Sequence, residues 1–108
     1  MQKQYTLEGA SSAELILLLS SRIRQRRLEK GMSREGLSDV SGVPVPTIAK
    51  FENMHAISLH QFLDLAIALG YTEELQELLK EAKYSTMEEL EQIRLNKERR
   101  HGRKLGGK

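Results

Sequence analysis

Apolar residues recur at intervals of three and four along most of the chain, and this spacing predicts helices. The first helix is expected over residues 12–30, where Leu15, Leu19 and Ile23 form a stripe that we expect to be buried. Because residues 16–18 beside this stripe are also apolar, the helix needs cover on several sides. That cover comes either from later helices or from a second subunit or partner protein.

Three more helices are predicted in the second half of the chain. One runs from the cap residue Ser58 to about residue 69, and its inward residues are expected to be Leu59, Phe62, Ala66 and Leu69. The next begins at Thr72 and carries an apolar stripe of Leu75, Leu78, Leu79 and Ala82 along one face. A last helix over 85–96 has a thin apolar content. The pattern therefore predicts an all-α protein.

The most specific segment is 33–53, which is typical of two short helices joined by a tight turn. Ser33 can cap the first of them, and Leu37 and Val40 lie three apart on a face that we expect to be buried. Gly42 stands at the turn, where glycine adopts the left-handed conformation without a steric penalty, and Val43 is expected to fill the space beneath it.

The second short helix is expected to begin near Pro44 to Pro46, since proline is tolerated in a first helical turn. Ile48 and Phe51 are its inward residues. In a helix-turn-helix the remaining face is offered to the major groove of DNA. That face comprises Val45, Pro46, Thr47, Ala49 and Lys50.

From IRQRR before the motif to SLHQFLDLAIALG after it, residues 22–70 resemble the lambda-repressor-like, Xre/Cro-type DNA-binding domains. The GMS entry, the GV turn and the IAKFEN ending carry the resemblance. It implies a compact five-helix helix-turn-helix domain that binds double-stranded DNA in the major groove. It also implies that the apolar stripe after Thr72 closes the core and supports a dimer. The DNA-binding residues implied are Arg27, Arg34, Val45, Pro46, Thr47, Ala49, Lys50 and Asn53.

The chain departs from the family pattern at three places. Gly36 stands inside a helix, where glycine costs about 1 kcal/mol relative to alanine. Pro44 and Pro46 replace the usual polar opening of the second helix, and Val45 stands where a polar side chain often contacts a base. These departures concern base recognition more than the fold.

Charge is segregated along the chain and suggests its organisation. The net charge is +3 over 20–55, −5 over 56–96 and +5 over 97–108. We expect an N-terminal arm (1–11), a helix-turn-helix domain (12–84), a C-terminal helical extension (85–96) and a basic disordered tail (97–108).

Other chemistry has little support. The chain has no cysteine, and the spacing of its three histidines, His55, His60 and His101, does not suit a metal site. Its serines fit caps and turns, so no nucleophile and base are paired and we expect neither an enzyme nor a cofactor. The longest apolar run, 15–19, is too short to span a bilayer, and we expect a cytoplasmic protein associated with the nucleoid through DNA.

Three functions remain open. The first is a sequence-specific repressor that binds a palindromic operator as a homodimer. The second, implied by a resemblance to HipB-type antitoxins, is an antitoxin and autorepressor that also binds a HipA-type kinase toxin. The third is a non-specific nucleic-acid binder that acts through the basic tail.

Overall fold

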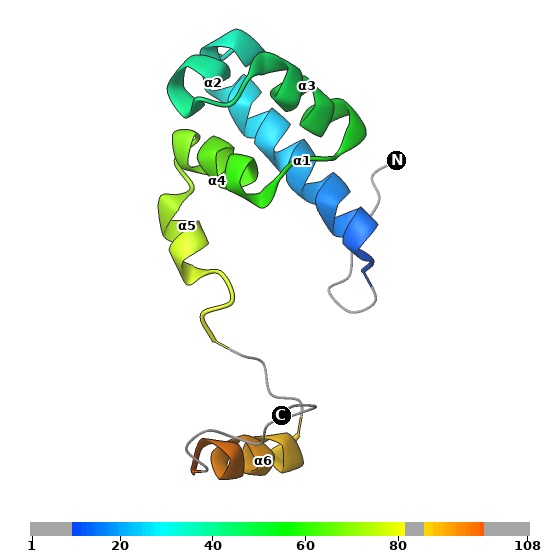
Figure 1. Ribbon diagram of the computed structural model, residues 1–108, viewed down its shortest axis with the longest axis vertical. Helices are drawn as coiled ribbons and strands as arrows, with labels where there is room; N and C mark the ends of the chain where they lie inside the picture. Colours follow the sequence, from blue (N-terminus) through cyan, green and yellow to red (C-terminus); the bar gives the residue numbers. More distant parts are fainter. Residues whose placement is uncertain (1–9, 82–85, 99–108) are drawn as a thin grey trace, which may run out of the picture. The chain divides into compact units, whose positions relative to one another are not determined.

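The computed structural model describes residues 10–81 and 86–98, and all the regular structure in these ranges is helical. The helices are α1 (Ser12–Glu29), α2 (Arg34–Ser41), α3 (Val45–Met54), α4 (Leu59–Ala68), α5 (Thr72–Glu77) and α6 (Met87–Glu98), shown in Figure 1. The predicted all-α class is confirmed. In this part of the chain, none of the helices has the length and hydropathy needed to cross a membrane.

The chain divides into two units, with the boundary between Gln76 and Glu77. The first unit contains α1 to α4 and nearly all of α5, and α6 belongs to the second. Lys97 and Glu98, expected to open the tail, are the last residues of α6. The expected arm over 1–9 and the rest of the tail, 99–108, lie outside the described residues.

Most helices begin where a serine or threonine hydroxyl accepts a backbone N–H. The Glu14 amide donates to Ser11 Oγ, and the Glu14 carboxylate accepts the Ser11 N–H in return, which completes a capping box at the start of α1. Ser58 caps α4 in the predicted way, and Thr86 Oγ1 accepts the Glu89 amide at the start of α6. The local sequence therefore sets the N-termini of these helices.

The core of the first unit is formed by side chains from α1 to α4 and from the turn between α2 and α3. The rings of Phe51 and Phe62 meet edge to face, with centroids 5.9 Å apart. Tyr71 and Leu75 pack against the same cluster from the C-terminal side. The buried apolar residues are Ile23, Leu37, Val43, Ile48, Phe51, Leu65, Ala66 and Leu69.

Helix α1 buries Ile23 as expected but leaves the rest of the expected stripe exposed. Leu15 and Leu19 are 41% and 40% exposed, whereas Ser20, Ile23 and Arg27 are buried. The run LILLL is apolar in every direction, so its spacing does not identify the inward side. In Figure 1 the N-terminal half of α1 extends beyond α3 and α4, which agrees with the exposure of Leu15 and Leu19.

Three other expectations about burial were wrong. Val40 is 58% exposed and Leu59 is 72% exposed. Helix α5 ends at Glu77, and Leu79 takes a left-handed backbone (φ 60°) with 90% of its surface exposed. The helical stripe expected in this segment therefore contributes only Leu75 to the core, and Ala82 lies outside the described residues.

Helix α6 carries ion pairs along its own surface. Arg94 bridges Glu91 and Glu98, the latter at 2.8 Å between Nη1 and Oε2. Its apolar residues Met87, Leu90 and Leu95 are exposed, with Met87 at 78%. The thin apolar content expected for this segment is thus found at the surface.

Candidate nucleic-acid interface

The turn between α2 and α3 is fixed by local chemistry and by one buried side chain. The Gly36 N–H donates to Ser33 Oγ at 3.0 Å, which caps α2 as expected. Gly42 ends α2 with φ 79°, and its N–H donates to the Ser38 carbonyl. Val43 is 1% exposed beneath the turn, also as expected. These contacts set the direction in which α3 leaves the turn.

Helix α3 is anchored by Ile48 and Phe51, which are 0% and 2% exposed, as the sequence predicted. Pro44 precedes the helix with an extended backbone (ψ 146°), and Pro46 occupies its first turn. Pro46, Lys50 and the later residue Asn53 are exposed on the other side. Helix α3 therefore presents an accessible face that carries one positive charge.

The remaining predicted groove residues, Val45, Thr47 and Ala49, are half-buried. Thr47 and Lys50 also border a shallow hollow between α3 and the start of α4. Ile57, Ser58 and Gln61 contribute to its other side. The accessible face of α3 is thus continuous with the start of α4.

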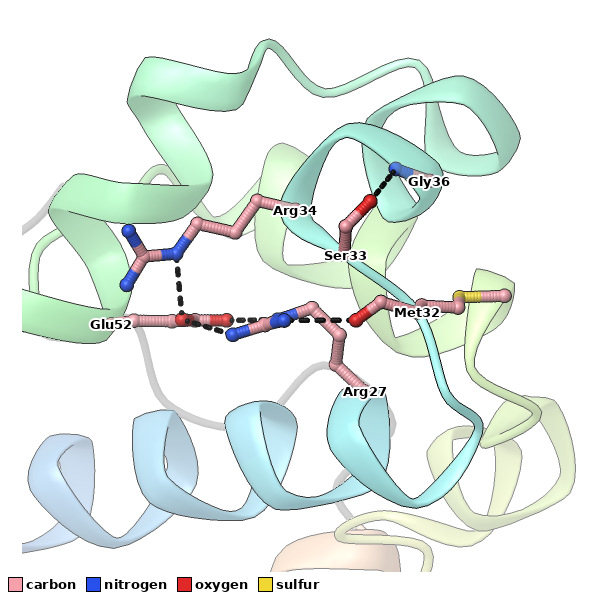
Figure 2. Close-up of polar contacts among 6 residues, drawn as sticks. All are labelled: Arg27, Met32, Ser33, Arg34, Gly36 and Glu52. Carbon is pink, nitrogen blue, oxygen red and sulfur yellow. Dashed lines mark hydrogen bonds and ion pairs between the residues drawn. The ribbon is translucent and has the colours of Figure 1, made fainter.

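Behind this face lies a buried ion cluster that joins three helices (Figure 2). Arg27 of α1 donates from Nε and Nη2 to the two oxygens of Glu52 at 2.8 and 2.9 Å. Its Nη1 donates to the Met32 carbonyl at 2.9 Å. Arg34 of α2 donates from Nε to Glu52 Oε1 at 3.1 Å. One carboxylate on α3 therefore holds guanidinium groups from α1 and α2.

The Glu52 carboxylate is charged in spite of its burial. The side chain has 0% exposure, and burial by itself would raise the pKa. The hydrogen bonds and positive charges of Arg27 and Arg34 outweigh this effect, so the pKa of Glu52 lies below its ordinary value. With two cations and one anion, the cluster carries a net positive charge.

Arg27, which the sequence placed among the residues that bind DNA, lies in this buried cluster. Its side chain is 7% exposed, and all three of its guanidinium nitrogens donate within the protein. Such a side chain is held in place by contacts within the protein. Arg34, by contrast, keeps 34% of its side chain exposed.

Glu52 was not among the residues selected from the sequence, although two spacings point to it. It lies four residues after Ile48 on α3, and Arg27 lies four residues after Ile23 on α1. Each charged residue is therefore on the buried face of its helix. Opposite charges at such positions on two helices that pack together indicate a buried ion pair.

A second polar contact links the end of α3 to α1. Ser20 Oγ and His55 Nδ1 share a hydrogen bond at 2.8 Å, and Ser20 Oγ also lies 3.0 Å from the Leu17 carbonyl oxygen. His55 ends α3 with a left-handed backbone (φ 60°). Within the described residues, no group of three or more histidine, cysteine or acidic side chains is arranged to hold a metal ion.

Comparison with known proteins agrees with this geometry. A family model described as "Helix-turn-helix" matches residues 23–76, half of the 108-residue chain, from the middle of α1 into α5. Comparison with curated protein sequences finds no match. The matched range contains the α2–turn–α3 unit, its accessible face and the whole Arg27–Glu52–Arg34 cluster.

Proposed function

Since the chain belongs to the helix-turn-helix family of the lambda-repressor/Xre type, which consists of DNA-binding transcriptional regulators, we propose that it is a repressor that recognises a specific operator. The observation that carries this proposal is the accessible face of α3. Pro46, Lys50 and Asn53 are exposed there, while Ile48 and Phe51 fix the helix from behind. A helix held in this way can enter a major groove.

Each residue of the face has a role that suits its chemistry. Lys50 contacts a base edge or a phosphate, and Thr47 and Asn53 donate hydrogen bonds to the DNA backbone. Val45, Pro46 and Ala49 make apolar contacts, including those with thymine methyl groups. Arg34 binds a phosphate, whereas Arg27 has no direct contact with DNA.

We also propose that the protein binds a palindromic operator as a homodimer, with recognition helices about 34–36 Å apart. Exposed apolar side chains at two places support association: Leu15, Ile16 and Leu19 on α1, and Leu78 and Leu79 after α5. Sedimentation equilibrium of the full chain measures the association state. A monomer at every concentration, which also binds DNA with one protomer per operator, contradicts the homodimer.

The finer proposal is an antitoxin that represses its own operon together with a HipA-type kinase. The exposed apolar residues of α6, Met87, Leu90 and Leu95, support a protein partner of this kind. Co-purification with the products of the genes beside its own tests the idea. Recovery of a kinase supports the antitoxin. Recovery of the chain without a kinase favours the alternative, a plain Xre-type repressor that acts on DNA in the cytoplasm.

The DNA-binding face is tested by replacing Lys50, because its exposed ammonium group is the only positive charge on α3. The probe is a duplex that the full chain selects from a random-sequence pool. We expect Lys50→Ala to weaken binding about tenfold or more, since one good base contact contributes about 1–3 kcal/mol. Lys80→Ala removes the same charge outside α3 and is the matched control. Equal binding by wild type and Lys50→Ala contradicts the placement of this face.

A further inference from the structure

The guanidinium group of Arg34 is divided between the protein interior and the surface. Its Nε donates to Glu52 Oε1 at 3.1 Å, inside a cluster where the Glu52 side chain is fully buried. Figure 2 draws no contact from its two terminal nitrogens to the other residues shown, and 34% of the side chain is exposed. The carboxylate therefore holds Arg34 through Nε, and neither terminal nitrogen takes part in the cluster's hydrogen bonds.

The position of Arg34 relates this cluster to DNA. Arg34 is the first residue of α2, and Glu52 lies on α3 between Phe51, which is buried, and Asn53, which is exposed on the proposed DNA-binding face. Arg27 neutralises the carboxylate from the other side with two hydrogen bonds. Of the three side chains, Arg34 alone is partly exposed, whereas Arg27 and Glu52 are buried. The excess positive charge of the cluster is therefore accessible at Arg34.

We infer that Glu52 is a positioning residue for DNA binding: it holds Arg34 so that both terminal nitrogens bind one phosphodiester of the DNA backbone. Arginine suits this task because its planar fork donates two parallel hydrogen bonds to a phosphate. The contact ties the register of α3 in the groove to the phosphate backbone. This inference rests on the proposed DNA-binding function and adds an acidic residue to its machinery.

A positioning role for Glu52 and simple electrostatics predict opposite effects of Glu52→Gln on the affinity for DNA. Glu52→Gln removes a negative charge near DNA, so Coulomb attraction by itself predicts tighter binding. If Glu52 positions Arg34, the same substitution weakens binding by about fivefold or more, because a charge-assisted contact is lost. In the Arg34→Gln background, Glu52→Gln then produces no further weakening.

Variants at Arg34 test the inference without depending on the folding of Glu52→Gln. Arg34→Gln removes the charge, and we expect the slope of log K against log salt to become shallower by about 0.9 per protomer. Arg34→Lys keeps the charge but lacks the fork, so the slope is retained while affinity falls about fivefold. Melting curves and circular dichroism establish that the Arg34 variants are folded at the assay temperature.

The experiment uses the full chain and the duplex that it selects from a random pool, with a scrambled duplex for comparison. Tighter binding by folded Glu52→Gln, or wild-type binding by Arg34→Lys at all salt concentrations, overturns the positioning role. If Glu52→Gln does not fold, the comparison of Arg34→Lys with wild type decides. If wild type itself shows no preference for the selected duplex, the proposed function fails, which is a distinct result.

Discussion

Replacement of Arg27 by methionine tests the assignment of this arginine to the fold. Methionine keeps a flexible apolar stem of similar length but removes three donors: two to Glu52 and one to the Met32 carbonyl. Glu52 Oε2 then has no partner among these contacts, and Oε1 keeps only the Nε of Arg34. The substitution therefore leaves a buried carboxylate with one of its three hydrogen bonds and one of its two neighbouring cations.

Breaking a buried ion pair by removing one partner costs about 3–5 kcal/mol. Because Arg34 still reaches one oxygen, we expect a loss near the lower end, about 3 kcal/mol. For a domain of this size, that corresponds to a fall in melting temperature of roughly 12–24 °C. Replacing the whole pair with two methionines, one at Arg27 and one at Glu52, leaves no buried charge and should restore most of the stability.

Thermal unfolding followed by circular dichroism at pH 7 measures these differences. Arg24→Met is the matched control, because Arg24 is an exposed arginine on the same helix, and it should change the free energy of unfolding by less than about 0.5 kcal/mol. If Arg27→Met melts within a few degrees of wild type, the buried cluster does not stabilise the fold. If the double variant is as unstable as Arg27→Met, lost packing and not an unpaired charge explains the loss.

Two further predictions concern pH and the turn. The pKa of Glu52 lies below its ordinary value of 4.5 in the folded protein, so its contribution is fully present above that pH and is lost as the pH falls through the folded-state pKa. Urea titrations between pH 7 and pH 2 should show this loss in wild type and a smaller one in a variant without both Arg27 and Glu52. Gly42→Ala should lower the free energy of unfolding by about 1–2 kcal/mol in the same titration, because its φ of 79° is strained for alanine. No atom lies within 4 Å of the added Cβ, so the cost comes from the backbone and not from a clash. Gly36→Ala is the control: Gly36 does not have a positive φ, and the substitution should be neutral or stabilising. An unchanged Gly42→Ala midpoint refutes strain at the turn.

Local signals predicted the helix-turn-helix well. Ser33 and Gly42 act through contacts within a few residues, so their roles can be inferred from type and position in the sequence. Ile48 and Phe51 were identified because polar and small residues surround them on α3. The family model confirms the class of DNA-binding domain that these residues indicated.

Expectations about burial failed where burial depends on how the rest of the chain folds around a residue, which the local sequence does not show. Leu15 and Leu19 have the right spacing for a core, but α1 extends past the helices that could cover them. Leu79 is apolar and follows a helical pattern, yet its left-handed backbone ends that pattern. For Arg27, the positive charge suggested a phosphate, and only the position of Glu52 on another helix reveals its partner.

The most direct test of the account is the preference of the full chain for its selected duplex over a scrambled duplex of the same length. We predict a ratio of dissociation constants of about 10³ or more at physiological salt, because α3 contacts bases in the selected sequence. Nearly equal dissociation constants for the two duplexes, both rising steeply with salt, would instead show a non-specific nucleic-acid binder and would contradict operator recognition.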